Sequence, residues 1–224
     1  GHAEYITAAA SNAYKIPENM SFVEAAALPI AAHTAWHCLI TQGQIQPWDD
    51  VLIQAAGSGV GSMGIQIAKM LGARVITTAG SDWKLEKAKQ LGADEAINYK
   101  QTPNLSKKIK ELTNGKGVDL VFDVVGADVW EENLLSLKQG GRLIITGVTS
   151  GARTNMNLSI LQGRPLTLMG SGGRSRRTFA DMMKMVNQGS LRGIVDRTFP
   201  LEAVPEAHKV MESREFFGKL VIEN

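Results

Sequence analysis

The sequence predicts an α/β protein with a doubly wound, six-stranded parallel sheet and helices on both faces. Apolar segments of strand length alternate with amphipathic segments of helix length from Asp50 to Gly170. These strand segments are nearly continuous apolar runs, as expected for a sheet that is covered on both faces. A glycine cluster also separates the first expected strand from the first helix of this region. The chain of 224 residues, 44% apolar and 21% charged, is long enough to bury such a core.

The residues before this region predict one strand and two helices. Ala3–Thr7 is a strand candidate. Ser21 and Glu24 form a capping-box pattern that starts a helix, and Pro29 ends it. A second helix is expected over residues 30–41, before Gly43 and Pro47.

The alternating region supplies the sheet. Its expected strands are Val51–Ala56, Arg74–Ala79, Glu95–Asn98, Val118–Val125, Leu143–Gly147 and Leu166–Gly170. The helices expected between them are Gly59–Leu71, Asp82–Leu91, Pro103–Thr113 and Ala127–Lys138. Each of these helices is followed within two residues by a glycine, which is a stop signal. Six strands in this order describe a Rossmann sheet that binds a dinucleotide.

The last part of the chain departs from this alternation. Its expected elements are a helix, a strand, a second helix and a final strand, at Thr178–Gln188, Ile194–Phe199, Ala203–Met211 and Phe217–Ile222. We therefore divide the chain into residues 1–45, a Rossmann domain at 46–189 and a C-terminal segment at 190–224.

Composition narrows the function classes. The 24 Lys and Arg against 22 Asp and Glu leave a net charge of +2, which argues against a nucleic acid or a membrane surface as partner. The single cysteine, Cys38, excludes an internal disulfide and fits a reducing cytoplasm. No apolar stretch approaches the length that spans a bilayer. The chain opens at Gly1 without Met, so we interpret it as a fragment or a processed product.

The glycine cluster predicts an anion site. It consists of Gly57, Gly59, Gly61 and Gly64. Glycines let the backbone turn sharply beside a ligand, and the helix N-terminus that follows attracts a phosphate. The loop departs from the G-x-G-x-x-G form, because Ala56, Ser58 and Gly61 occupy its three positions. The alternative is a tight turn without a ligand, but so many glycines cost stability unless the backbone must be approached closely.

The end of the second strand favours NADP(H) over NAD(H). An NAD site has an acidic residue there for the ribose 2′-hydroxyl, and this chain has Ala79. Gly80, Ser81 and Lys84 follow, and Ser81 is expected to cap the next helix. A hydroxyl, a helix start and a lysine suit a 2′-phosphate. Asp82 adds a negative charge nearby, and we interpret it as a helix-start acid that faces solvent.

A metal site is considered for the helix near residue 35. His33 and His37 lie four residues apart on one helical face, beside Cys38. The alternative is two polar residues on a helix that faces another domain, with a buried thiol. Because no third and fourth ligand can be identified, we expect no metal and name no catalytic residue in this chain.

An ordered series of motifs resembles the medium-chain dehydrogenase/reductases, in the branch of zinc-type alcohol dehydrogenases and quinone oxidoreductases. The motifs are Ala25–Pro29 with Thr34–Trp36, Ala55–Gly61, Thr78–Ser81 with Lys84, Leu91–Asp94 with Ile97–Tyr99, Gly117–Asp119 with Asp123–Gly126, Gly140–Arg142 and Phe217–Val221. The resemblance covers nearly the whole chain. It implies that an N-terminal GroES-like catalytic domain is missing, and that residues 1–45 and 190–224 belong to the catalytic side.

The resemblance also implies the residues that contact the cofactor. They are Thr34, Gly57, Ser58, Gly59, Val60, Gly80, Ser81, Lys84, Tyr99, Val125, Gly126, Gly147, Val148, Gly170, Ser171 and Lys219. Gly57–Val60 would bind the pyrophosphate. The adenosine ribose and its phosphate would be surrounded by Gly80, Ser81, Lys84 and Tyr99. Val125 and Gly126 would border the adenine side. Thr34 would lie at the nicotinamide, together with Gly147, Val148, Gly170 and Ser171. Lys219 would approach from the C-terminal strand.

Three functions remain open. The first is the NADP(H)-binding portion of an enzyme that moves hydride between nicotinamide and an alcohol/carbonyl pair. The second is a zinc-independent quinone or enoyl reductase, because Ile30 stands where the family usually has a zinc-ligating cysteine. The third, of another class, is a non-catalytic nucleotide-binding module. The family further implies a homodimer through the edge at the sixth strand. The identity of the substrate does not follow from the sequence.

Overall fold

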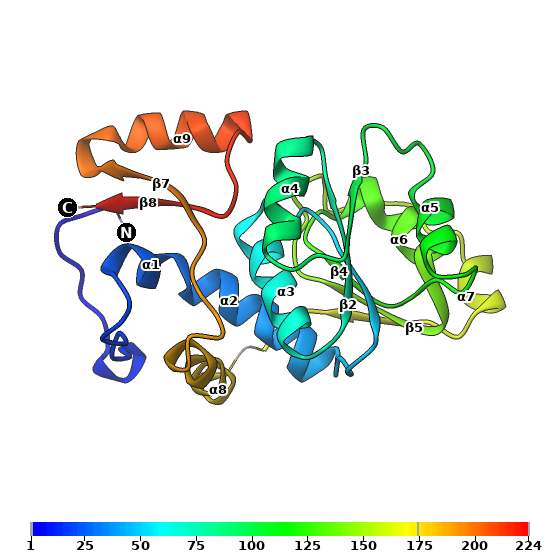
Figure 1. Cartoon of the computed structure of the whole chain (residues 1–224), viewed down its shortest axis with the longest axis horizontal. Helices are drawn as coiled ribbons and strands as arrows, with labels where there is room; N and C mark the ends of the chain where they lie inside the picture. Colours follow the sequence, from blue (N-terminus) through cyan, green and yellow to red (C-terminus); the bar gives the residue numbers. More distant parts are fainter. Residues whose placement is uncertain (1, 174, 224) are drawn as a thin grey trace.

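The chain folds around two parallel sheets of unequal size. The computed structural model describes residues 2–173 and 175–223. Figure 1 shows the larger sheet between helices, and a smaller group of elements from both ends of the chain beside it. The larger sheet has six parallel strands in the order β3-β2-β1-β4-β5-β6. This order confirms the predicted doubly wound Rossmann sheet.

The bounds of the elements agree with most of the expected ones. The strands are β1 (Asp50–Ile53), β2 (Arg74–Ala79), β3 (Glu95–Asn98), β4 (Val118–Asp123), β5 (Leu137–Ile145), β6 (Thr167–Gly170), β7 (Val195–Pro200) and β8 (Lys219–Glu223). The α-helices are α1 (Phe22–Ala27), α2 (Pro29–Trp36), α3 (Gly59–Met70), α4 (Asp82–Gln90), α5 (Leu105–Leu112), α6 (Trp130–Ser136), α7 (Ser159–Gly163), α8 (Arg176–Asn187) and α9 (Val204–Ser213). Strands β7 and β8 pair in parallel as a second sheet.

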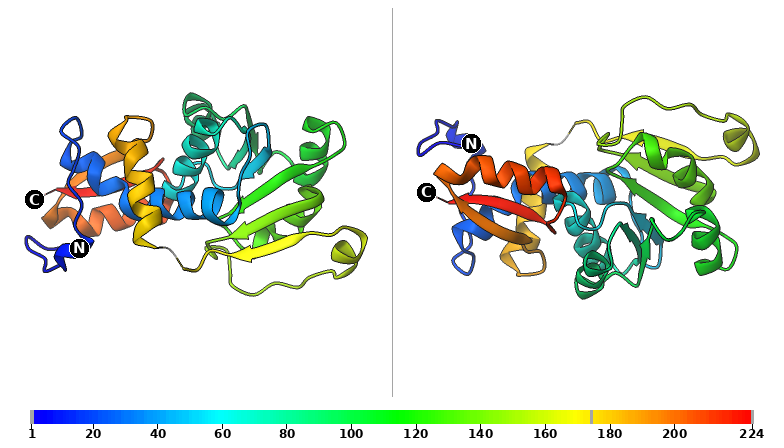
Figure 2. Two further views of the ribbon diagram at one scale, coloured as in Figure 1. Left: turned by 90° about the horizontal axis from the view of Figure 1, so that it is seen from below. Right: turned by 90° about the horizontal axis from the view of Figure 1, so that it is seen from above.

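Alternate residues of the central strands point into two separate apolar cores. Val51 and Ile53 of β1 join the core under α2, α3, α4 and α8, whereas Leu52 joins the core under α5, α6 and α7. This alternation follows from the two-residue period of a strand. Figure 2 shows helices on both sides of the sheet. Burial on both faces explains why the strand sequences are continuously apolar.

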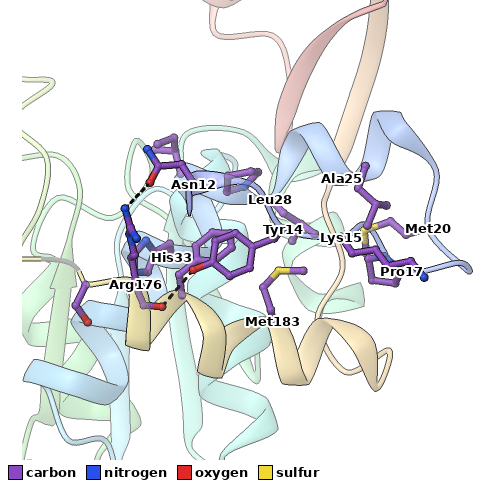
Figure 3. Close-up of a pocket in the computed structure, with 15 residues that line it drawn as sticks. Asn12, Tyr14, Lys15, Pro17, Met20, Ala25, Leu28, His33, Arg176 and Met183 are labelled. Atoms are coloured by element: carbon purple, nitrogen blue, oxygen red, sulfur yellow. Dashed lines mark hydrogen bonds between the residues drawn. The ribbon is translucent and has the colours of Figure 1, made fainter. Parts of the chain in front are cut away.

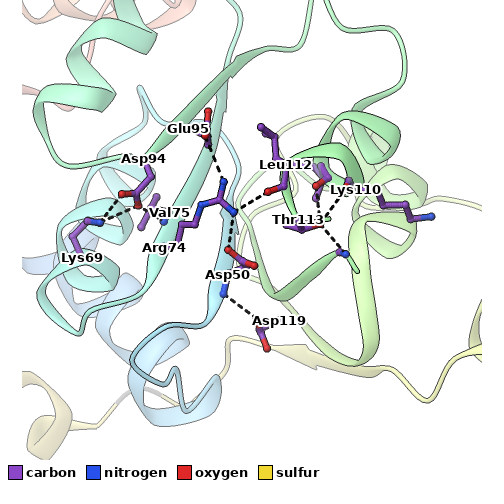
Figure 4. Close-up of polar contacts among 12 residues, drawn as sticks. Asp50, Lys69, Arg74, Val75, Asp94, Glu95, Lys110, Leu112, Thr113 and Asp119 are labelled. Atoms are coloured by element: carbon purple, nitrogen blue, oxygen red, sulfur yellow. Dashed lines mark hydrogen bonds and ion pairs between the residues drawn. The ribbon is translucent and has the colours of Figure 1, made fainter. Parts of the chain in front are cut away.

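Charged side chains join the strands at their amino ends. Arg74 donates to Asp50 Oδ1 (3.2 Å) and to the carbonyl oxygen of Leu112 (2.9 Å), and it lies 3.5 Å from Glu95 Oε1 (Figure 4). The backbone N–H of Asp50 donates to Asp119 Oδ2 at 2.9 Å. These contacts lie at the edge of the sheet opposite to the glycine loop, so they fix strand register away from the expected ligand.

The expected strand at Ala3–Thr7 is wrong. All five residues are described and none of them belongs to a strand. Tyr5 is 90% exposed and Ile6 is 79% exposed. A strand needs a ladder of backbone hydrogen bonds to a second strand, and neither of the two described sheets includes this segment.

The expected helix at Ala127–Lys138 is too long at its end. A 3-10 turn over Ala127–Val129 leads into α6, which ends at Ser136. Leu137 and Lys138 are extended and open β5, where Leu137 pairs with Val118. The register shifts after this pair, and Gly140 has a φ of 74°. The glycines therefore form an irregular section within β5 and do not end a helix.

Strands β1 and β4 also end earlier than expected. Strand β1 stops at Ile53 and β4 stops at Asp123, because the residues that follow leave extended geometry. Ala55 has a φ of 56° and Gly126 has a φ of 96°.

In the expected helix at residues 30–41, α2 ends at Trp36 and a π-helical turn continues to Gln42.

Candidate functional site

The glycine loop is built by close backbone contacts. The N–H of Gly61 donates to Ser58 Oγ at 2.9 Å, which caps the first turn of α3. A Cβ atom added to Gly61 would collide with the carbonyl group of Ala55, and one added to Gly64 would lie 3.1 Å from the ring of Phe122. Glycine at these positions lets α3 begin directly above β1 and β4. Its N-terminus therefore lies at the carboxyl edge of the sheet.

The C-terminal segment packs against this loop. The N–H of Gly218 donates to the carbonyl of Gly57 at 2.9 Å, and Gly218 forms an isolated bridge with Ser58. A Cβ atom added to Gly59 would lie 2.5 Å from Lys219 Cδ. The stem of Lys219 therefore crosses the loop at Gly59.

Lys84 lies on the other side of the loop. Its ammonium donates to the carbonyl oxygen of Arg214, and it lies 5.2 Å from the Trp83 ring centroid and 5.8 Å from that of Phe216. Burial lowers the pKa of Lys84; the acids Glu215 and Asp196 oppose this, and the cations Lys100 and Arg214 reinforce it. The Lys84 ammonium is therefore partly desolvated in a group of mixed charge, where an anionic ligand would add a favourable partner.

Tyr99 and Lys100 close the end of β2. A Cβ atom added to Gly80 would lie 2.6 Å from the Tyr99 hydroxyl oxygen and 3.1 Å from Lys100 Cε. The sequence predictions missed Lys100 and Arg214, the two further cations near Lys84. Lys100 follows Tyr99 directly and could have been found, whereas Arg214 reaches the group only through the fold.

The start of α4 differs in part from the prediction. Ser81 occupies the N-cap position, but its side chain makes no capping hydrogen bond, so its expected capping role is wrong. The hydroxyl lies at the helix start. Asp82 is exposed, as expected, and its Oδ1 accepts from Asn98 Nδ2 at 2.8 Å.

The loops after β4, β5 and β6 lie against one another. The N–H of Ser150 donates to the carbonyl of Val125 at 2.9 Å, and a Cβ atom on Gly126 would lie 3.0 Å from Val148 Cα. Thr146 Oγ1 lies 2.7 Å from Ser171 Oγ, which links the ends of β5 and β6. The predicted contacts at Val125, Gly126, Gly147, Val148, Gly170 and Ser171 thus belong to one group of loops at the carboxyl edge.

The histidines of the metal hypothesis have other partners. His33 Nε2 lies 2.8 Å from Thr178 Oγ1, and His37 Nε2 lies 3.0 Å from the carbonyl of Gly172. Cys38 is buried. Within residues 2–173 and 175–223, no group of three or more His, Cys, Asp or Glu side chains is arranged to hold a metal ion. Thr34, expected near the nicotinamide, is only 6% exposed on α2.

A cavity of about 490 Å³ lies between the N-terminal segment and α8 (Figure 3). Tyr14 and Phe179 line it, with ring centroids 4.4 Å apart, and Arg176 holds the N-terminal segment through Ser11 and Asn12. None of the sixteen residues expected to contact the cofactor is among its described lining residues. It is therefore separate from the glycine loop.

The sheet order and the glycine loop define a doubly wound protein of the Rossmann class. Residues 59–188 match the family model for zinc-binding dehydrogenases. The chain is 34% identical to a zinc-type alcohol dehydrogenase-like protein of Schizosaccharomyces pombe, over 92% of this chain and 61% of the relative. It therefore belongs to the zinc-binding dehydrogenase family, in the medium-chain branch of zinc-type alcohol dehydrogenases and quinone oxidoreductases.

Two solved structures show the same arrangement. A crystal structure of an NAD-dependent alcohol dehydrogenase superposes with a TM-score of 0.94 at 41% identity, over 100% of this chain and 65% of that one. The quinone oxidoreductase of Escherichia coli, crystallised with NADPH, gives 0.86 at 32% identity, over 96% and 69%. The chain thus spans about three fifths to two thirds of the length of these relatives.

Proposed function

We propose that this chain is the NADP(H)-binding portion of an oxidoreductase that transfers hydride between nicotinamide and an alcohol/carbonyl pair. The observation that carries the proposal is the glycine loop, which places the start of α3 at the sheet edge between Lys84 and Lys219. Glycines let the backbone come close to a pyrophosphate, and the two lysines, whose stems lie over Gly57 and Gly59, supply positive charge. NADP(H) would supply the hydride chemistry when bound, and the protein would supply position and electrostatics.

The preference for NADP(H) rests on the end of β2. Ala79 stands where an NAD site has its acidic residue, and Lys84, Lys100 and Arg214 supply positive charge nearby, next to the acids Glu215 and Asp196. The similar structures do not favour one cofactor, because one is an NAD-dependent enzyme and another was crystallised with NADPH. The proposal therefore depends on the cations around Gly80 and on the 2′-phosphate that they suit.

A zinc-independent quinone or enoyl reductase is the second candidate. It is favoured by Ile30, which is 69% exposed and stands where the family's zinc ligand is expected. An apolar side chain supplies no metal ligand. The distinction lies in the remainder of the protein: Cys and His ligands there would support the alcohol dehydrogenase, and their absence the reductase. A non-catalytic nucleotide-binding module remains the proposal of another class, and hydride transfer by the whole protein would rule it out.

Further proposals concern the whole protein. We place residues 1–45 and 190–224 on the side of a catalytic domain, with 46–189 as the Rossmann domain. The outer edge of β6 is the proposed contact of a homodimer, and the cytoplasm is the proposed location. No helix among residues 2–173 and 175–223 has the length and apolar character to cross a membrane. Substrates of the whole protein would be small carbonyl compounds, alcohols or quinones.

Calorimetric titration tests the cofactor proposal. The chain is titrated with NADPH, NADH, 2′,5′-ADP and 5′-AMP at one fixed salt concentration. We expect NADPH to bind more tightly than NADH, and 2′,5′-ADP more tightly than 5′-AMP, because only the first of each pair carries the 2′-phosphate. Tighter binding of NADH would contradict the preference for NADP(H). No binding of either dinucleotide would contradict the proposed function.

A further inference from the structure

A buried chain of polar side chains runs beneath the loops of the proposed cofactor site. It consists of Thr78, Gln54, Asn133 and Asp123, each at most 1% exposed. Thr78 Oγ1 donates to Gln54 Oε1 at 2.5 Å, and Gln54 Nε2 donates to Asn133 Oδ1 at 2.6 Å. The chain thus links the end of β2 to the end of β1 and then to α6.

Each end of this chain holds a loop. The carbonyl of Thr78 accepts from the N–H of Ala56 at 2.9 Å, and its Oγ1 lies 3.4 Å from the backbone nitrogen of Ala55. Ala55 adopts a φ of 56°, which an L-residue keeps only when its surroundings impose it. The first residues of the glycine loop are therefore fixed to β2.

Asp123 fixes the loop after β4. Its Oδ1 accepts from the N–H of Val125 at 2.7 Å and from the N–H of Gly126 at 3.1 Å. Burial raises the pKa of Asp123, whereas these two N–H groups and the side chain of Asn133 favour the ionised carboxylate. The positive φ of Gly126 belongs to the backbone conformation that this carboxylate holds.

The unpaired polar atoms of Asn133 and Asp123 are complementary. Within residues 2–173 and 175–223, Asn133 Nδ2 and Asp123 Oδ2 are buried without a hydrogen-bond partner. The first is a donor and the second an acceptor. The side chain of Asn133 also lowers the pKa of the Asp123 carboxyl group. A buried polar group without a partner is costly, so a donor and an acceptor beside each other favour pairing.

We infer that Asn133 is a positioning residue that couples the glycine loop to the loop at Val125 and Gly126, so that both present their backbone to one dinucleotide. This inference rests on the proposed function. It assigns a role in ligand binding to an interior helix residue that does not touch the ligand. The same polarity would be kept if the acid and the amide exchanged positions.

An exchange of the two side chains tests the inference. Asn133→Asp places a second carboxylate against Asp123, and Asp123→Asn combined with Asn133→Asp restores one donor facing one acceptor. We expect the single variant to bind NADPH at least about tenfold more weakly, with faster amide exchange at Val125 and Gly126. The double variant should return to within about threefold of wild type. Leu134→Ala, at the adjacent buried residue of α6 in the core under α5, α6 and α7, is the matched control for lost stability.

The outcomes separate the two proposals. Wild-type affinity in Asn133→Asp, a double variant no better than the single one, or an equal loss of affinity in Leu134→Ala would each overturn the inference. Should Asn133→Asp not fold, Thr78→Val removes the donor at the far end with little change of shape, and unchanged NADPH affinity there would overturn it too. If the wild type binds neither dinucleotide, the proposed function fails, and amide exchange at Val125 and Gly126 alone decides whether Asn133 positions that loop.

Discussion

The backbone N–H of Gly218 donates a 2.9 Å hydrogen bond to the carbonyl oxygen of Gly57. This bond joins the last part of the chain to the glycine loop near its beginning. The conformation of the loop therefore depends on residues that local sequence does not associate with it. A change at the C-terminal segment is expected to appear at the proposed pyrophosphate site.

Gly218→Ala is the first prediction. Gly218 has a φ of 95°, and an added Cβ atom would lie 2.5 Å from the carbonyl oxygen of Ile194. Left-handed geometry costs about 1–2 kcal/mol for alanine, and crowding adds about 1–3 kcal/mol. We expect a loss of at least about 2 kcal/mol in denaturant unfolding, with weaker NADPH binding. Gly189→Ala is the control, because Gly189 has a φ of 75° with nothing within 4 Å of an added Cβ, so a loss as large there would contradict the crowding argument.

Lys84→Gln is predicted to change cofactor selectivity. The glutamine keeps part of the stem but removes the charge beside the end of β2. We expect NADPH affinity to fall by about tenfold, equivalent to about 1.4 kcal/mol, with a much smaller change for NADH. Lys89→Gln removes a charge from the same helix at a residue paired with Glu86, and it should leave both affinities unchanged. Equal losses for both cofactors in Lys84→Gln would refute a role at the 2′-phosphate.

Trp48→Gly is predicted to stabilise the fold. Trp48 is 88% exposed and has a φ of 69°, and its N–H donates to the carbonyl of Gly72 at 3.0 Å. Relief of left-handed strain returns about 1–2 kcal/mol, and the flexibility of unfolded glycine removes about 0.5–1 kcal/mol. The net gain should be about 0.5–1 kcal/mol in denaturant unfolding. Trp48→Ala keeps the Cβ atom, so a gain of the same size there would show that the aromatic ring, and not the backbone, is responsible.

The pH dependence of stability should differ between two aspartates. Burial raises the pKa of Asp123 above its ordinary 3.8, so the folded state takes up this proton before the unfolded state. Lowering the pH from 7 towards 4.5 should therefore shift stability in favour of wild type relative to Asp123→Asn. Urea midpoints measured across this range test the direction, and a flat difference would contradict a raised pKa.

Asp94→Asn supplies the opposite case. Burial alone would raise the pKa of Asp94, but Lys69 and the N–H of Val75 outweigh it and hold the pKa below 3.8. Its contribution is therefore present above pH 3.8 and is lost only as the pH falls below that value. The stability difference between wild type and Asp94→Asn should stay constant from pH 7 to 4.5.

The sequence predicts the sheet because its signals are local. Strands β2 and β3 have the expected bounds, since apolar runs and glycine stops lie within single segments. The strand at Ala3–Thr7 failed because β propensity cannot supply a pairing partner. Leu137 was assigned to a helix because its pairing with Val118 is non-local. Strand periodicity indicates which apolar side chains are buried. It does not identify buried polar side chains such as Gln54.

The residues of the candidate site also differ in whether local sequence can predict them. The glycine loop is contiguous, so its motif can be recognised within a single stretch of sequence. Arg214 joins the site from a position 130 residues beyond Lys84. Asn133 reads as an ordinary helix residue, because its significance depends on the side chains that face it across the sheet edge.

The contact between Lys84 and the carbonyl of Arg214 changes what an affinity at this site measures. The ammonium already has an acceptor at the end of α9, so an anion that engages Lys84 replaces that acceptor and does not fill an empty position. The observed binding free energy is then the difference between two contacts. Variants that loosen the end of α9 should strengthen anion binding without touching the anion. Affinity measured for this chain thus reports the order of its C-terminal helix as well as the chemistry of its ligand.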